Sequence, residues 1–192
     1  MYRSVLLSDE KVGAIKNVYD AEIINKLNDK FQLFGNIIGY NNLEENKNIL
    51  KNIEYAFSTW GTPQYDKKTI QKYFPNLKCI FYAAGSVKNF AENFLNCGVK
   101  IFSAWKANAV PVAEYTVAQI VLANKGFFRL SAVKNKSEFL GRYKGNYDVS
   151  VGLIGLGSVG SEVAERLKKY ELNVFAVDPY ASAEKANNLN VK

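Results

Sequence analysis

The chain has 192 residues, of which 48% are hydrophobic and 22% are charged, so it has the composition of an ordinary globular protein with a sizeable core. Its formal net charge is +7, but the lysines are scattered, with no basic block that would follow a nucleic-acid backbone. No apolar run is long enough to span a membrane, and the first residues turn acidic too early for a signal peptide. We therefore expect a cytoplasmic protein without nucleic-acid or membrane partners.

The first half of the sequence alternates short apolar runs with stretches of helical periodicity. Strands are predicted at residues 4–7, 31–34, 55–58, 78–83 and 100–103. Helices are predicted at residues 21–28, 43–52, 67–74 and 88–96, with Asp20 and Asp66 as the N-caps of the first and third. This alternation predicts an α/β fold with a doubly wound parallel sheet.

The two cysteines lie in this half of the chain, Cys79 in an apolar strand and Cys97 at the end of a helix. They lack the CxxC spacing of a redox or metal site. We expect two buried free thiols and assign no metal ligands.

A long helix is predicted from residue 111 to residue 134, with Pro111 in its first turn. It is apolar on more than one side, which favours burial between layers, domains or subunits. Gly126 in its middle indicates a kink or a close packing contact.

A boundary between two domains is expected at residues 104–110, just before this helix. It gives a first domain of residues 1–104 and a second domain of residues 105–192. A shorter helix is predicted near residues 136–142, and the dipeptide Gly145-Asn146 then indicates a turn.

An apolar strand follows that turn and leads into the most informative motif of the chain, GxGxxG. Gly155 permits a sharp turn, Gly157 lets the backbone approach a pyrophosphate, and Gly160 lets the next helix pack against the strand. Main-chain amides at the helix start, which includes Ser158 and Val159, then face the phosphate charge with the help of the helix dipole. The motif predicts a dinucleotide-binding site.

An acidic residue completes the dinucleotide pattern. A second apolar strand at residues 173–177 ends at Asp178, and the spacing from Gly160 is close to the roughly 20 residues expected for a ribose-binding acid. Its carboxylate would accept hydrogen bonds from the ribose hydroxyls and repel a 2′-phosphate. Pro179 follows, and no arginine stands ready to pair with such a phosphate, so NAD is favoured over NADP.

The second domain is short for a dinucleotide-binding fold. After Asp178 the sequence predicts one helix at residues 181–189 and the start of another strand at residue 191. A sheet of six parallel strands needs several more strand–helix units, about a hundred residues. We therefore expect an incomplete Rossmann domain in the front part of a larger protein.

Segments in a characteristic order identify a family resemblance. They are residues 58–63, 81–90 and 108–116 and the glycine motif through Pro179. The chain resembles the NAD-dependent D-isomer-specific 2-hydroxyacid dehydrogenases. The resemblance implies a flavodoxin-like substrate domain followed by an NAD-binding Rossmann domain, with a 2-keto or 2-hydroxy acid held in the cleft between them. It also implies a homodimer.

The resemblance further implies roles for individual residues. Main-chain amides from Ala84 to Ser86 would hold the substrate carboxylate, although Gly85 is also consistent with a simple turn. Trp60 would line the substrate pocket or pack in a core or hinge. Val112 and Thr116 would contact the nicotinamide end of the cofactor or serve helix packing.

The absence of histidine is the main departure from the family. The family uses a histidine to transfer the proton, an acid to orient it and an arginine to hold the carboxylate, all from a segment beyond residue 192. No catalytic residue is therefore assigned, and we expect the 192-residue chain to be inactive by itself. The alternatives are a catalytically dead, truncated NAD-binding or interaction protein, and a relative of amino-acid dehydrogenases or adenosylhomocysteine hydrolase.

Overall fold

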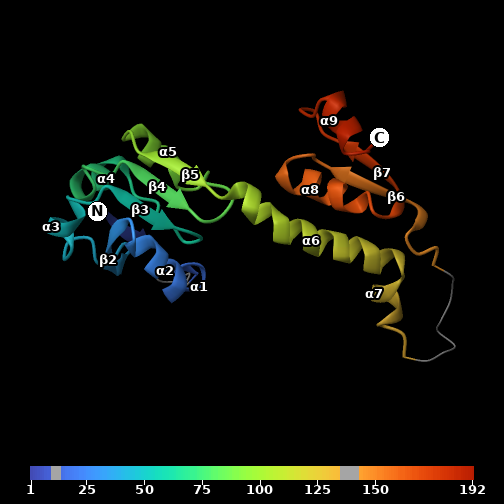
Figure 1. Cartoon of the computed structure of the whole chain (residues 1–192), viewed down its shortest axis with the longest axis horizontal. Coiled ribbons are helices and arrows are strands. Elements are labelled where there is room, and N and C mark those ends of the chain that lie inside the picture. Colours follow the sequence, from blue (N-terminus) through green and yellow to red (C-terminus); the bar gives the residue numbers. More distant parts are fainter. Residues whose placement is uncertain (10–13, 135–142) are drawn as a thin grey trace. The chain divides into compact units, whose positions relative to one another are not determined.

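A computed structural model of the chain describes residues 1–9, 14–134 and 143–192 (Figure 1). It divides into two units, Met1–Ala107 and Asn108–Lys192, and the boundary falls within helix α6 (Trp105–Asn124). The expected short helix at 136–142 lies outside the described residues. Within the described residues, no helix combines the length and apolar character needed to cross a membrane.

The first unit is built on one sheet of five parallel strands. The strands are β1 (Tyr2–Leu7), β2 (Phe31–Ile38), β3 (Tyr55–Ser58), β4 (Cys79–Tyr82) and β5 (Lys100–Ser103). Their spatial order is β2-β1-β3-β4-β5, which is the flavodoxin-like order and confirms the predicted doubly wound α/β sheet. In this order the chain reverses its direction of winding between β1 and β3, so ligands are expected at the carboxyl ends of these strands.

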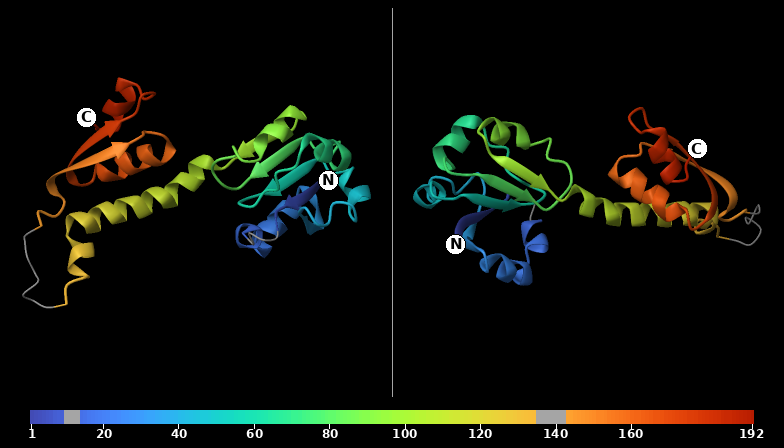
Figure 2. Two further views of the ribbon diagram at one scale, coloured as in Figure 1. Left: turned by 180° about the vertical axis from the view of Figure 1, so that it is seen from behind. Right: turned by 45° about the horizontal axis from the view of Figure 1, so that its top comes forward.

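Helices lie on both faces of this sheet. They are α1 (Ile15–Val18), α2 (Ala21–Asn28), α3 (Lys47–Leu50), α4 (Lys67–Tyr73) and α5 (Ala91–Asn96). The views of Figures 1 and 2 show α3, α4 and α5 on one face, with α1 and α2 on the other. Asp20 and Asp66 cap α2 and α4 as predicted, because each carboxylate accepts a main-chain N–H of the first turn.

The core of the first unit lies between the sheet and α3, α4 and α5. Side chains along each strand point alternately to the two faces of the sheet, and those on the core face include Val5, Leu7, Ala56 and Ile80. The opposite face carries rings in contact from strand to strand, among them Phe57 and Phe81. Cys79 is buried and Cys97 half-buried, and both are free thiols.

The helix predicted at residues 43–52 is wrong in length, since only Lys47–Leu50 form it. The cause is local: the Asn42 side chain accepts from the Gly39 amide and donates to the Ile37 carbonyl, and Asn46 donates to the Asn42 carbonyl. Asparagine side chains that bond to the nearby backbone replace helical hydrogen bonds. Helix α1 was not predicted, and β2 extends four residues further than expected.

The second unit contains two parallel strands, β6 (Tyr147–Ile154) and β7 (Glu171–Val177). Its helices are α6 (Trp105–Asn124), α7 (Phe127–Leu130), α8 (Ser158–Leu167) and α9 (Ala183–Asn188). Side chains from α6, α8 and both strands form one apolar cluster that includes Ala113, Val117, Leu156, Val163, Leu167 and Val174. Lys192 pairs with β7 through its main-chain N–H and carbonyl, as expected for the start of a third parallel strand.

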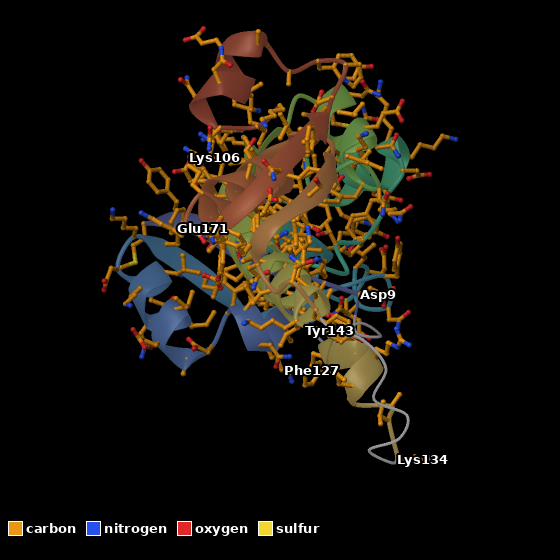
Figure 3. The ribbon with its side chains drawn as sticks, turned by 90° about the vertical axis from the view of Figure 1, so that its right-hand side faces the viewer. Asp9, Lys106, Phe127, Lys134, Tyr143 and Glu171 are labelled. Atoms are coloured by element: carbon orange, nitrogen blue, oxygen red, sulfur yellow. The ribbon has the colours of Figure 1, made fainter. Side chains whose placement is uncertain are left out.

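Both predicted ends of the long helix are wrong, because helix α6 spans Trp105–Asn124 and not residues 111–134. It begins at Trp105, so Pro111 lies inside the helix and not in its first turn. It ends at Asn124 because Gly126 has a left-handed φ of +73°. Gly126 also lies against the ring of Tyr143, so the predicted close packing contact is confirmed. Figure 3 labels Tyr143 and Phe127, the residue that follows Gly126.

Candidate functional site

The glycine turn lies between the end of β6 and the start of α8. Gly155 has a φ of +91°, which a residue with a side chain rarely adopts. A Cβ on Gly160 would lie 2.0 Å from the carbonyl oxygen of Gly155. The first glycine therefore makes the turn and the third lets α8 begin directly against it, as the motif predicts.

Gly157 differs from both. It caps α8 with a φ of −66°, is exposed, and has no atom of the described residues within 4 Å of the position that a Cβ would take. The fold itself therefore does not require glycine here. The open main chain at Gly157, with the amides of Ser158 and Val159 at the helix start, leaves room for a phosphate group.

Asp178 lies at the end of β7 and reaches the glycine turn. One carboxylate oxygen accepts the Leu156 amide at 2.6 Å, and the other accepts the amides of Tyr180 and Ala181 at 2.8 and 3.1 Å. These bonds, that from Leu156 first, hold the pKa of Asp178 below its usual range. A carboxylate has about four acceptor positions, so about one remains for a ribose hydroxyl. The neighbouring Pro179 is exposed.

The residues present therefore fit a dinucleotide. The turn offers an open main chain and a helix N-terminus for phosphate, and Asp178 offers an ionised acceptor at the adjacent strand end. The structure thus brings together Gly155, Gly157, Gly160 and Asp178, as the sequence predicts.

Sequence reasoning missed two side chains that act on this turn. The Leu156 carbonyl accepts from the Ser161 hydroxyl at 2.8 Å and from the Lys185 ammonium at 2.6 Å. Ser161 follows the motif directly and gave a possible signal, since a hydroxyl in the first helical turns commonly bonds to the nearby backbone. Lys185 is distant in sequence, and no local pattern points to it.

The structure does not join Val112 and Thr116 to the glycine turn. The Thr116 hydroxyl donates to the Val112 carbonyl one helical turn earlier. The buried face of α6 is formed instead by Ala109, Ala113 and Val117. Glu114 is exposed and pairs weakly with Arg166 of α8, at 3.9 Å.

The expected substrate residues belong to the first unit, at the carboxyl ends of two neighbouring strands. Trp60 follows β3, and its side chain is 49% exposed. The chain around it is fixed: the Ser58 hydroxyl donates to the Leu7 carbonyl at 2.6 Å, and Gly61 accepts the Asp9 amide at 2.6 Å. Trp60 thus lies on a held loop beside the winding reversal between β1 and β3.

The small-residue turn at residues 84–86, which follows β4, has three residues that differ in burial. Ala84 is fully buried, so it cannot meet a ligand in this arrangement, whereas Gly85 is half-buried and Ser86 exposed. The Ser103 hydroxyl donates to the carbonyls of Ala84 and Gly85 at 3.0 and 2.6 Å. This leaves the amides of Gly85 and Ser86 as the candidates for binding an anion.

Fold and site together define an α/β protein with a dinucleotide-binding turn. Residues 118–192 match the family model "D-isomer specific 2-hydroxyacid dehydrogenase, NAD binding domain". D-3-phosphoglycerate dehydrogenase of Archaeoglobus fulgidus is 35% identical over 124 residues, which cover 61% of this chain and 23% of that protein. Over residues 118–192 the chain is thus similar to the NAD-binding domain of the D-isomer-specific 2-hydroxyacid dehydrogenases, and the cofactor of this matched domain is NAD.

Solved structures show the same fold. A phosphoglycerate oxidoreductase from Rhizobium etli aligns with all of this chain and 60% of its own, with a TM-score of 0.72 and 15% identity. An NAD-dependent formate dehydrogenase from Staphylococcus aureus, solved in complex with NAD, aligns with 93% of this chain and 56% of its own, with a TM-score of 0.59 and 21% identity. The chain thus spans less than two thirds of the length of these structures and about a quarter of the curated relative.

Proposed function

We propose that the protein to which this chain belongs is an NAD-dependent oxidoreductase acting on the CH–OH group of a D-2-hydroxy acid, and reducing the 2-keto acid in the reverse direction. The observation that carries the proposal is the glycine turn, open at Gly157 and tied to Asp178. In this proposal residues 1–104 form the substrate-binding domain and residues 105–192 the front part of the NAD domain.

The second unit positions the cofactor, which supplies hydride chemistry when bound. The amides of Gly157, Ser158 and Val159 hold the pyrophosphate at the start of α8. Asp178 accepts a ribose hydroxyl with its remaining acceptor position, and its negative charge disfavours a 2′-phosphate.

The first unit positions the substrate in this proposal. Amides of Gly85 and Ser86 bind the carboxylate, while Ala84 and Ser103 support the turn from within. Trp60 lines the pocket beside them. The exposure of the Trp60 ring supports this role, because a ring that served the core alone would be buried.

The 192 residues include no histidine, and no catalytic residue is assigned among them. Reduction of a ketone needs a proton donor at the developing alkoxide. We therefore expect these 192 residues alone to bind NAD without turnover.

A cytoplasmic homodimer is the assembly we propose. Exposed apolar side chains on α6, Val112 and Tyr115, support an apolar contact between two copies. Light scattering coupled to size exclusion tests this, with a Tyr115→Lys variant expected to be monomeric. A wild-type monomer at micromolar concentration contradicts the dimer.

Binding measured on the purified 192-residue chain tests the proposed function. Calorimetric titration is expected to show NAD binding with weaker NADP binding. Addition of 2-keto acids is expected to shift the amide resonances of Gly85 and Ser86 and the indole resonance of Trp60, with no such shifts from 2-amino acids. NADH oxidation in the presence of 2-keto acids is expected to stay at background.

Each result addresses one part of the proposal. Absence of NAD binding contradicts the cofactor site. Shifts caused by 2-amino acids instead of 2-keto acids contradict the substrate class and favour an amino-acid dehydrogenase. Turnover above background contradicts the expected inactivity of this chain.

A further inference from the structure

Leu156 is held by three elements at once. It stands between Gly155 and Gly157 in the dinucleotide turn and is only 2% exposed. Its N–H donates to the Asp178 carboxylate at the end of β7, while its carbonyl accepts from Ser161 of α8 and from Lys185 of α9. A carboxylate therefore binds the N–H, and an ammonium binds the carbonyl, of one buried residue.

The hydrogen bonds of Leu156 with Asp178 and with Lys185 are strong because each involves a charged group. Hydrogen bonds to charged groups are shorter and about twice as strong as neutral ones, and both distances here are 2.6 Å. The two charges reinforce each other. The negative Asp178 carboxylate attracts the partly positive N–H of Leu156, and the positive Lys185 ammonium attracts its partly negative carbonyl oxygen. Together they fix the orientation of the main chain through this residue.

Such fixation matters because glycines flank Leu156. Glycine has the largest backbone freedom of any residue, so a free turn of this composition would sample many conformations. Ordering those conformations when the cofactor arrives would weaken binding. Among the hydrogen bonds that the described residues make to this turn, the one from helix α9 is donated by Lys185.

We propose that Lys185 is a positioning residue of the NAD site, which pre-orders the glycine turn through the Leu156 carbonyl. The inference rests on NAD binding by the second unit. Lys185 acts on the turn and not on the substrate, so its removal weakens cofactor binding while leaving the fold in place.

Lys168 provides a matched control in the same unit. Its ammonium also donates to a main-chain carbonyl across α8 and α9, that of Asn188, at 2.8 Å. It pairs with Glu165 on α8 and makes no hydrogen bond to the glycine turn. Replacement of either lysine by methionine removes one charge and one bond to a carbonyl.

The experiment compares NAD binding by wild type, Lys185→Met, Lys185→Gln and Lys168→Met, using calorimetry on the 192-residue chain. Lys185→Met is expected to raise the dissociation constant of NAD about tenfold, in line with loss of a charged hydrogen bond. Glutamine is a shorter, neutral donor, so Lys185→Gln is expected to raise the dissociation constant of NAD less than Lys185→Met does. The increase is expected to be at least as large as that caused by Lys168→Met. Lys168→Met is expected to stay within about twofold of wild type. Amide resonances of Leu156 and Gly157 are expected to shift or broaden in Lys185→Met without ligand, and to stay in place in Lys168→Met.

The outcomes separate the inference from the proposed function. No NAD binding by wild type contradicts the cofactor site itself. Wild-type binding with an unchanged dissociation constant in Lys185→Met overturns the positioning role. Equal losses in Lys185→Met and Lys168→Met also overturn it, because they indicate a general structural effect. If Lys185→Met does not fold, the same criteria apply to Lys185→Gln.

Discussion

At the scale of single residues, two glycines of the turn lack a side chain for different reasons. Gly160 is required by the protein, since a Cβ there would lie 2.0 Å from the Gly155 carbonyl oxygen. Gly157 has open space around it, and its φ of −66° is one that any residue adopts. Gly160 therefore serves folding, whereas Gly157 is the glycine for which we propose a role in ligand binding.

Alanine substitutions distinguish these two roles. Gly160→Ala is expected to lower the free energy of unfolding of the second unit by about 2 kcal/mol, because the backbone oxygen opposite cannot rotate away. Gly157→Ala is expected to change it by less than about 0.5 kcal/mol and to weaken NAD binding instead. Denaturant unfolding and NAD titration of both variants check this. Equal destabilisation by the two substitutions contradicts it.

Asp178 makes the second unit sensitive to acid. Its pKa is lowered in the folded state, chiefly by the Leu156 amide, so its contribution to stability is complete above its ordinary pKa of about 4. The contribution is lost as the pH falls through the lowered pKa. We expect Asp178→Asn to be less stable than wild type at pH 7, and the two unfolding curves to converge toward pH 2. A difference that persists at pH 2 contradicts this explanation.

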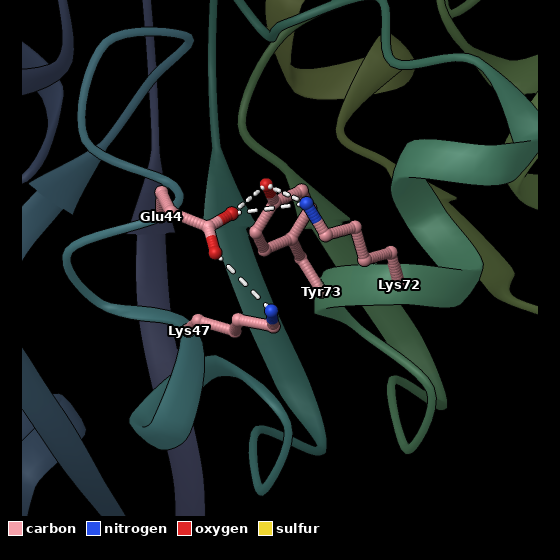
Figure 4. A network of polar contacts seen from close by, with 4 residues as sticks. All are labelled: Glu44, Lys47, Lys72 and Tyr73. Atoms are coloured by element: carbon pink, nitrogen blue, oxygen red, sulfur yellow. Dashed lines mark hydrogen bonds and ion pairs between the residues drawn. The ribbon is translucent and has the colours of Figure 1, made fainter.

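At the scale of elements, a group of charged side chains joins the segment before α3 to α4. Figure 4 shows Glu44 accepting hydrogen bonds from Lys47, Lys72 and Tyr73. The bond from Tyr73 is the main cause that lowers the pKa of Glu44 to about 2. Glu44 lies in the segment where a helix was predicted and where Asn42 and Asn46 bond to the backbone instead.

The Glu44 group is expected to stabilise the first unit only above a low pH. The folded-state pKa is depressed, so the contribution is present above the ordinary pKa of about 4.3 and is lost as the pH falls toward 2. Unfolding of wild type and Glu44→Gln from pH 7 to pH 2 should show a small difference that disappears at the acid end. Added salt should also reduce it, because the side chain is exposed.

The end of α6 offers a second test at this scale. The Tyr143 ring covers Gly126, and its hydroxyl is buried without a hydrogen-bond partner in the part of the chain that the structure describes. Tyr143→Phe is therefore expected to keep or raise stability, whereas Gly126→Ala is expected to lower it by about 1–3 kcal/mol. Thermal unfolding of both variants checks this. A clear loss in Tyr143→Phe means that the hydroxyl has a partner in solution.

At the scale of the whole molecule, each unit has an apolar sheet face that is only partly covered. Phe102 on β5 is 58% exposed, and Ile154 and Val177 at the ends of β6 and β7 are 97% and 71% exposed. Parallel sheets are normally covered on both faces. These exposed apolar side chains favour association of the sheet faces.

The division into two units predicts a selective effect of the cofactor. A ligand that binds only the folded second unit stabilises it by about 2.7 kcal/mol at a concentration one hundred times the dissociation constant. We expect NAD to shift the unfolding of residues 108–192 and to leave the first unit unchanged. Hydrogen exchange with and without NAD measures this for each unit. Equal protection of both units contradicts separate behaviour.

Local sequence patterns determined the elements and the cofactor turn. Strands 55–58 and 100–103 and helix 21–28 were predicted with their observed ends, because apolar periodicity and the Asp20 cap are local signals. The turn at Gly155 and the close packing at Gly160 followed from the glycine spacing between an apolar strand and a helix, since the geometry of a strand–turn–helix leaves few alternatives.

Contacts between distant segments decided the rest. Only the tertiary structure showed that Ala84 is buried. It also showed that main-chain amides occupy most of the acceptor positions of Asp178, and that Lys185 donates to the Leu156 carbonyl. Such facts depend on where a side chain ends in space, and residues 29 positions apart carry no shared local pattern. The sequence by itself determined the dinucleotide-binding class and NAD as the cofactor, because the motif is short and local. The tertiary structure decided which groups hold that motif in place, because burial and hydrogen-bond partners arise only when the elements pack.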